Sequence, residues 1–269
     1  MKLHKYKMII ANGDVSQILP YFFDLNNISP QEKYVINCIN IMFNNQIILK
    51  VNKRLLNKED RETLAKLKDD IFDISKTDVI ETFKKYKFNI ISDINDIKTM
   101  KNIPYFKSRS YKINNFVQNK LIKVPHKNIE YEYECNNKIY RLKYYVGQRI
   151  ICRQSFKRKN TRLYTNYIYE ILNIEDDEDD EYIISLKNIN DEEIMTIKYD
   201  HLKYISLPYS NTCHSSQGIT IYEPYTIFDS NIVYSDRRWL WTALTRTTSL
   251  KNISIFEHSK NECQVLEKM

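Results

Sequence analysis

The sequence predicts an α/β protein in which a parallel sheet flanked by helices is interrupted by a small antiparallel β unit. Two patterns predict this fold class. Short apolar strands alternate with amphipathic helices over residues 7–121 and again over 206–256, which is typical of a parallel α/β sheet. Between these stretches, over residues 144–205, short β-rich segments follow one another with turn residues between them. The antiparallel unit is therefore an insertion within an α/β domain.

Each α/β element has a local reason in the pattern of apolar residues. Apolar runs predict strands, and apolar residues repeating every three or four positions predict helices. In chain order we expect a strand at 7–11, a helix at Pro30–Asn44, a strand at Gln46–Val51, helices at Lys58–Phe72 and Lys76–Tyr86, a strand at Asn102–Phe106 and a helix at Lys112–Leu121. After the insertion we expect a turn entering a helix at Asn211–Ile221, a strand at Tyr225–Phe228, a helix at Arg237–Leu244 and a strand at Asn252–Phe256.

The insertion is predicted to contain four strands, at Gln148–Arg153, Tyr164–Ile174, Glu181–Lys187 and Glu193–Tyr199. Their short lengths and turn spacing favour a small barrel. The acidic run Glu175–Glu181 falls between two of them, and we interpret it as a solvated hairpin tip because it lacks the glycine of a calcium loop. We expect no metal site here.

Composition narrows the function classes. The net charge is +7, but residues 175–193 hold ten carboxylates and one Lys, so the rest of the chain carries +16. That surplus favours a polyanion such as nucleic acid, and a basic surface that only maintains solubility explains it equally. The five Cys residues are dispersed, which indicates reduced thiols. The sequence lacks both a membrane span and a signal-peptide core, so we expect a soluble, intracellular protein with no membrane contact.

Two segments near the beginning of the chain could serve phosphate chemistry. Gly13-Asp14-Val15-Ser16-Gln17 follows an apolar strand, where Gly lets the backbone approach a phosphate and Gln17 can bond a γ-phosphate or its attacking water. Arg54 closes the next strand and presents a planar fork suited to a phosphoryl group. An ordinary turn and a surface arginine are the alternatives.

Two later segments are more specific. Thr212-Cys213-His214-Ser215-Ser216-Gln217-Gly218-Ile219-Thr220 offers several hydroxyl and backbone donors to a phosphate chain, more than a helix cap requires. Trp241-Thr242-Ala243-Leu244-Thr245-Arg246 follows at a short interval and ends in a second candidate phosphate-binding arginine. Within the insertion, Arg153, Lys157 and Arg158 lie in a basic stretch next to Phe156, where cations could follow a phosphate backbone and rings could stack on bases, although a solvated basic loop is as good an explanation.

Taken in order, these four segments resemble motifs III, IV, V and VI of superfamily 1 helicases, and the third is similar to the RecD-like form of motif V. The resemblance implies an ATP-dependent DNA or RNA helicase. It further implies catalytic roles for Gln17, Arg54 and Arg246 at the γ-phosphate, and nucleotide contacts from Gly13, Asp14, Gln217 and Gly218. The residues expected to bind nucleic acid are Thr212, His214, Ser215, Thr220, Arg153, Lys157 and Arg158.

The resemblance also predicts the domain organisation. Residues 1–44 would end a first RecA-like domain, and 45–143 and 206–269 would form the second RecA-like motor domain. Residues 144–205 would be the SH3-like β-barrel inserted in that second domain. We expect single-stranded nucleic acid as the partner, DNA rather than RNA.

The phosphate-binding loop of a complete motor is not in this sequence. The only glycines are Gly13, Gly147 and Gly218, so the Gly-x-x-x-x-Gly-Lys-Ser/Thr pattern of Walker A cannot occur, and the acidic Walker B motif is not recognised either. We therefore expect ATP and Mg²⁺ to bind only if a second polypeptide carries Walker A and B. A stand-alone strand-binding module and the remnant of a split helicase gene remain alternatives, so whether the chain is an enzyme stays open.

Overall fold

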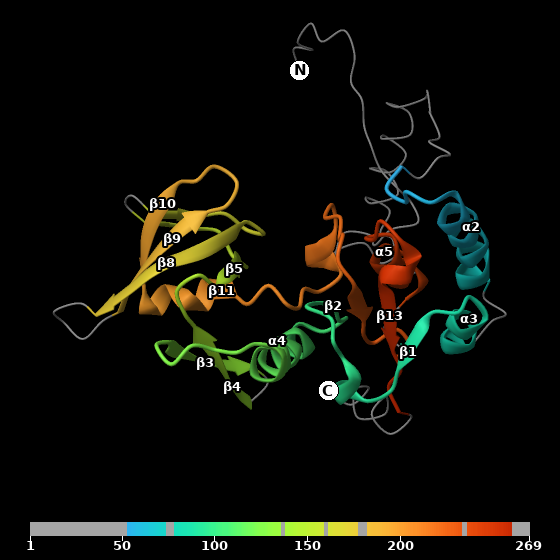
Figure 1. The fold of residues 1–269 in the computed structure, drawn as a ribbon, viewed down its shortest axis with the longest axis horizontal. Coiled ribbons are helices and arrows are strands. Elements are labelled where there is room, and N and C mark those ends of the chain that lie inside the picture. The colour runs from blue at the N-terminus through green and yellow to red at the C-terminus, as the bar shows by residue number, and fades with distance from the viewer. Residues whose placement is uncertain are drawn as a thin grey trace, which may run out of the picture.

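The structure, a computed structural model, describes residues 53–73, 78–135, 138–158, 161–176, 182–232 and 236–259. The strand and helix expected at 7–11 and Pro30–Asn44 and the strand expected at Gln46–Val51 lie outside these residues, as does motif III. Figure 1 shows two lobes, one built on a parallel sheet and one on an antiparallel sheet, with helix α4 between them.

The first lobe contains a four-stranded sheet in the order β1-β13-β12-β2. Its strands are β1 (Asn89–Ile91), β2 (Lys101–Ile103), β12 (Tyr225–Ile227) and β13 (Ile253–Phe256). Every neighbouring pair is parallel. The two central strands come from the end of the chain and the two outer strands come from before the insertion. The antiparallel lobe is therefore inserted within a single parallel sheet.

Within the described residues, four helices pack on this sheet or beside it. They are α2 (Lys58–Phe72), α3 (Val79–Lys85), α4 (Lys107–Leu121) and α5 (Arg237–Leu244). Side-chain caps fix the beginnings of three of them, since Asn57, Asp78 and Asp236 each accept a backbone N–H from the first turn that follows. Short 3₁₀ turns occur at Ile94–Asp96, Tyr199–Tyr204, His214–Ser216 and Leu250–Asn252.

Alternating side chains give the parallel sheet two buried faces. Ile227 and Ile255 belong to the core formed with α2, α3 and α5, whereas Phe228 and Phe256, one residue further, belong to the core that includes α4. Figure 1 shows α2 and α3 on one side of this sheet and α4 on the side facing the second lobe. Helices on both faces of a parallel sheet confirm the predicted α/β class.

The second lobe contains a five-stranded antiparallel sheet in the order β10-β9-β8-β5-β11. Its strands are β5 (Arg149–Cys152), β8 (Ile168–Asp176), β9 (Tyr182–Asn188), β10 (Ile194–Lys198) and β11 (Ile205–Ser206). A hairpin of β6 (Phe156–Arg158) and β7 (Thr161–Leu163) lies against β10, where the Thr161 hydroxyl donates to the Thr196 carbonyl at 2.8 Å. Part of the acidic run, residues 177–181, lies outside the described residues.

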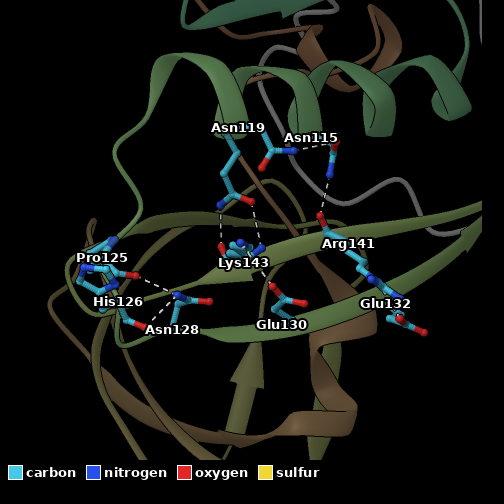
Figure 2. Close-up of polar contacts among 10 residues, drawn as sticks. Asn115, Asn119, Pro125, His126, Asn128, Glu130, Glu132, Arg141 and Lys143 are labelled. Atoms are coloured by element: carbon cyan, nitrogen blue, oxygen red, sulfur yellow. Dashed lines mark hydrogen bonds and ion pairs between the residues drawn. The ribbon is translucent and has the colours of Figure 1, made fainter.

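A second hairpin, β3 (Ile129–Cys135) and β4 (Lys138–Tyr144), is held against α4 by side-chain amides. Gln118 donates to the Lys143 carbonyl at 2.6 Å and accepts from the Lys143 N–H at 2.9 Å, so its amide pairs with the strand edge as a neighbouring strand would. Figure 2 also shows a single bond one turn earlier, where the Asn115 side-chain amide donates to the Arg141 carbonyl at 2.6 Å. These bonds fix the hairpin to the helix that joins the lobes.

Several boundaries differ from expectation for identifiable reasons. No helix follows the turn at Asn211–Ile221, because the segment makes one 3₁₀ turn and Gly218 then adopts a φ of +83°. The strand expected at Tyr164 begins at Ile168, after a turn with Asn166 at a φ of +67°. Pro104 lies just beyond the last residue of β2, and α4 begins at Lys107 rather than Lys112. Strands β1, β3, β4, β6, β7 and β11 were not expected.

Candidate nucleotide and strand site

Arg54 joins three segments that lie far apart in the sequence. Its Nε donates to the Thr220 hydroxyl at 3.1 Å, and its Nη1 donates to the Thr245 carbonyl. Thr220 ends the motif V segment, and Thr245 directly precedes Arg246 in motif VI. Three segments chosen from the sequence for phosphate chemistry therefore meet at one guanidinium group.

Arg246 lies beside this contact and is only 1% exposed. Its Nε donates to the Thr242 carbonyl at 2.9 Å and its Nη2 donates to the Thr245 hydroxyl at 3.1 Å. The residue follows the last turn of α5, where free carbonyls and the helix dipole both favour a cation. Burial of a charged group is costly without such partners, so this position is built to hold a guanidinium.

Thr245 links the two arginines. Its carbonyl accepts from Arg54 and its hydroxyl accepts from Arg246, so one residue touches both cations through different atoms. The Arg246 carbonyl in turn accepts from the Ile221 N–H at 2.8 Å, which ties motif VI to the end of motif V. We refer to Arg54, Thr220, Thr245 and Arg246 as the arginine network.

The motif V segment is a compact turn fixed by its own small side chains. The Thr212 and Ser215 hydroxyls lie 3.1 Å apart, and the Ser216 N–H and hydroxyl both donate to the Thr212 carbonyl at 3.1 Å. Cys213 is fully buried, and its Sγ lies 3.5 Å from the Trp239 carbonyl of α5. Burial raises the pKa of the Cys213 thiol, because the charged form is disfavoured there. Cys213 thus acts as an apolar anchor.

His214, Gln217 and Gly218 lie on the outer side of this turn and are exposed. Although much of the His214 side chain reaches solvent, packing around its ring lowers the pKa of the imidazole, and the nearby Asp236 carboxylate opposes that shift. A neutral imidazole can donate and accept at once, which suits it to contacts with a polar strand. The roles of His214, Gln217 and Gly218 stay predictions.

The chain entering motif V is clamped at Ser210. The Ser210 carbonyl accepts from the Ser110 hydroxyl at 2.7 Å and from Arg153 Nη2 at 2.7 Å, and Asn114 accepts from the Ser210 N–H at 2.9 Å. Arg153 therefore points at a carbonyl in the protein, and burial lowers the pKa of its guanidinium. In this conformation Arg153 connects the antiparallel lobe to motif V.

The other cations expected on the insertion differ in their placement. Lys157 lies in β6 with an exposed side chain, and the side chain of Arg158 lies outside the described residues. Rings and cations do gather nearby: Phe156 stacks on Tyr204 at 5.0 Å between ring centroids, and the Arg162 guanidinium lies 4.6 Å from the centroid of Tyr164. This surface, rather than Arg153, presents exposed cations beside aromatic rings.

Gly13, Asp14 and Gln17 lie outside the described residues, so their roles stay predictions. Among the described residues there is also no group of three or more His, Cys, Asp or Glu side chains that could hold a metal ion. No helix in the described part of the chain is long and apolar enough to cross a membrane.

A buried cluster around one ion pair was not anticipated from the sequence. Asp229 follows β12 and is 0% exposed, with its Oδ1 lying 2.9 Å from Arg109 Nε and 2.8 Å from His258 Nε2. Its Oδ2 accepts from the Tyr105 N–H at 2.9 Å. The cluster ties the ends of β12 and β13 to the first turn of α4. The only signal in the sequence is an Asp directly after an apolar strand.

Of three comparisons with known proteins, the one with solved structures finds similar proteins. No family model matches the sequence, and no curated protein matches it. Among solved structures, Bacteroides Pif1 bound to ssDNA is 17% identical, with a TM-score of 0.54, and the match covers 95% of this chain and 64% of that one. A structure of forked dsDNA unwinding by two coordinating Pif1 helicases gives 16% identity and a TM-score of 0.54, covering 95% and 63%.

A third neighbour is Bacteroides Pif1 helicase in complex with ADP-AlF3 and ssDNA, with 18% identity, a TM-score of 0.50, and coverage of 90% of this chain and 60% of that chain. The present chain thus spans less than two thirds of each of these structures. At these identities the likeness establishes the fold, and it agrees with the resemblance to superfamily 1 helicases seen in motifs IV to VI.

Proposed function

Proceeding from the fold that this chain shares with Pif1 helicases of superfamily 1, we propose that it is the second motor half of an ATP-dependent DNA helicase. In this proposal the chain contributes two phosphate-binding arginines and part of the track for a single strand. The Walker A and B motifs come from outside these 269 residues, on a second polypeptide.

The arginine network carries this proposal. In phosphoryl transfer the protein mainly positions groups and stabilises charge on the phosphoryl oxygens, and arginine forks are the residues most suited to that task. Arg54 and Arg246 both contact Thr245, which holds the two guanidinium groups near each other. Arg54 would hold the γ-phosphate, and Arg246 would exchange its contacts with Thr242 and Thr245 for phosphoryl oxygens.

ATP and Mg²⁺ would bind at the boundary with the second polypeptide. Arg54 and Arg246 fit the triphosphate, whereas the described residues contain no cluster of carboxylates suited to the magnesium ion. The ion would neutralise charge on the phosphates, and its ligands would come from Walker B. Gln17, with Gly13 and Asp14, would sense the γ-phosphate, and Gln217 and Gly218 would border the nucleotide.

For the strand, motif V offers Thr212, His214, Ser215 and Thr220. We infer that the antiparallel lobe corresponds to the SH3-like barrel of related helicases, with Lys157 and Arg158 on its basic hairpin. The sheet order and the contact between Thr161 and Thr196 support that inference, because the β6–β7 hairpin folds back on β10 and begins to close the sheet.

A stand-alone strand-binding module is the second candidate. The stacked rings and cations around Phe156, Arg162 and Tyr204 favour it, because such a surface can bind a single strand when no ATP is bound. The two candidates differ in what ATP does. Once the Walker-bearing polypeptide is added, ATP should change the affinity of a helicase half for its strand. The affinity of a stand-alone module should be the same with and without ATP.

ATP turnover by the purified chain tests the proposal. We expect none with or without single-stranded DNA, and we expect turnover stimulated by the strand when the Walker-bearing polypeptide completes the site. In that completed motor, Arg246→Ala should abolish hydrolysis and leave strand binding nearly intact. Turnover by this chain alone, or equal turnover by the Arg246→Ala motor and its parent, would contradict the proposal.

A further inference from the structure

A cavity of about 270 Å³ lies where the two lobes meet. Its walls come from the beginning of β2, from the turn before β5 and from the segment that leads into motif V. The residues that matter for its chemistry are Lys101, Tyr145, Gln148, Arg149, Pro208 and Tyr209. We call it the junction pocket. No residue of the arginine network lines it, so it is a separate feature of the molecule.

Gln148 forms the floor of the junction pocket. It is 3% exposed, and neither its Nε2 nor its Oε1 has a hydrogen-bond partner among the described residues. The Tyr209 hydroxyl lies close enough to the Gln148 amide to interact with it electrostatically, yet it completes a well-formed hydrogen bond to neither amide atom. Buried side-chain amides are normally satisfied, since losing water without a replacement partner costs free energy. A ligand that forms hydrogen bonds with both amide atoms would explain why they are unpaired at the floor of a cavity.

The backbone around Gln148 is fully engaged, which fixes the direction of its side chain. The Gln148 N–H donates to the Tyr145 carbonyl at 3.1 Å, and the Gln148 carbonyl accepts from the Ile171 N–H at 3.0 Å. Gly147 donates to the Ile171 carbonyl at 2.7 Å and has a φ of +84°, a conformation that favours glycine. One of only three glycines in the chain therefore shapes the turn that presents this amide.

Two cations border the junction pocket. Lys101 Nζ donates to the Pro208 carbonyl at 3.3 Å, and Arg149 lies at the exposed rim. Burial lowers the pKa of Lys101, the Glu223 carboxylate opposes this, and Arg149 adds to the lowering. Among the described residues neither cation forms a close ion pair with a carboxylate. An anion placed between them would therefore relieve the repulsion between two like charges.

Two tyrosines, Tyr145 and Tyr209, line the junction pocket. Tyr209 is 8% exposed and is held by Asn102, which donates to its carbonyl at 3.0 Å. Burial raises the pKa of Tyr209 to about 12, so its hydroxyl remains a donor at neutral pH. Tyr145 lies on the same cavity. Aromatic rings beside an amide with free donor and acceptor atoms suit a planar heterocycle, because its face can stack while its edge is read.

We propose that the junction pocket binds one nucleotide unit, with the base against Tyr145 or Tyr209, its edge on the Gln148 amide and its phosphate on Lys101 and Arg149. The cavity is slightly below the range of ~300–1,000 Å³ for pockets that enclose drug-sized ligands, which fits one base better than a larger ligand. The unit is either one nucleotide of a bound strand or a free nucleoside monophosphate. The strand source rests on the proposed function, and the free nucleotide does not.

The test compares two probes on the full chain. Titration calorimetry measures the four nucleoside 5′-monophosphates, and fluorescence anisotropy measures homopolymer strands of about 16 nucleotides. Gln148→Met keeps the shape of the floor and removes its donor and acceptor. We expect the parent to prefer one base and the variant to reduce that ratio of affinities by at least about tenfold, which is the discrimination that a two-bond contact to a base edge provides. Its melting temperature should stay the same or rise, since an unpaired amide is removed.

Arg149→Gln is the second variant, because this rim residue is exposed and its replacement leaves the core unchanged. This variant should bind all four nucleoside monophosphates more weakly than the parent does. Arg141→Gln is the matched control: it removes one exposed arginine outside the pocket and should change neither probe. Parent-like base preference in Gln148→Met, or no nucleotide binding by the parent, would overturn the proposal. If the chain binds the strand and the Gln148→Met variant binds it equally well, only the pocket proposal is contradicted. If the chain binds monophosphates in a way that depends on Gln148 but does not bind the strand, only the helicase proposal is contradicted.

Discussion

At the scale of single residues, Thr245 determines how the two arginines are arranged. Its hydroxyl is the acceptor for one donor of Arg246, and its carbonyl is independently the acceptor for Arg54. The sequence drew attention to Arg54, Thr220 and Arg246 because each lies in a motif at the right interval. It could not reveal Thr245 as the joint, since pairing across 191 positions depends on the tertiary fold.

Thr245→Val should separate these two roles. The variant keeps the carbonyl and the shape of the side chain, but it leaves a donor of the buried Arg246 guanidinium without its acceptor. Removing a hydrogen bond to a charged group should lower the free energy of unfolding by about 1.5–3 kcal/mol, measured by urea denaturation. Thr247→Val is the control: its hydroxyl bonds only neutral backbone groups at Ser249, so about 1 kcal/mol is expected. Equal losses would contradict a special role for Thr245.

At the scale of elements, the buried cluster around Asp229 links strands to α4. Asp229→Asn removes the charge that balances Arg109, and a buried ion pair broken on one side typically costs about 3–5 kcal/mol. We expect a loss of that order in urea denaturation. Glu132→Gln breaks an exposed pair with Arg141 at 2.9 Å and should cost less than about 1 kcal/mol. A small loss for Asp229→Asn would mean that the cluster is not a structural joint.

Motif V is attached to α5 through Cys213, and the reactivity of this thiol reports on that attachment. The thiolate is the reactive form, and burial raises the pKa of Cys213 and raises that of Cys152 to about 11. At pH 8 both should stay protonated and resist iodoacetamide in the native protein, as mass spectrometry of the digest would show. They should react at the rate of unfolded thiols in denaturant. Fast native labelling of Cys213 would show that motif V detaches from α5.

How far the elements could be predicted depended on local signals. The observed limits of α2 and α5 are the expected ones, because Asn57 and Asp236 cap them and apolar residues repeat along their buried faces. The β3–β4 hairpin was missed although Glu and Tyr alternate along Glu130–Glu134, which is a readable strand pattern. The helix expected in motif V was wrong because small hydroxyl residues satisfy the turn locally, as they often do.

At the scale of the whole molecule, the alternation of strands and helices was enough to predict an α/β fold with an antiparallel insertion. The sheet order β1-β13-β12-β2 was not predictable, because it depends on how strands from both sides of the insertion pair. The net charge likewise predicted only the class of partner. A surplus of basic residues indicated a polyanion, yet only the structure separates Arg153, which holds Ser210, from the exposed Lys157.

The central claim is that this chain binds a single strand as part of a helicase motor. Fluorescence anisotropy with a labelled single-stranded oligonucleotide, measured over a range of salt concentrations, tests it most directly. We expect tighter binding to the single strand than to a duplex, with log affinity falling by about 0.7 per phosphate contact for each tenfold rise in salt. Lys157→Gln should weaken binding and reduce this slope. Lys66→Gln, an exposed change on α2, should do neither. Absence of binding, or equal effects of the two variants, would contradict the account.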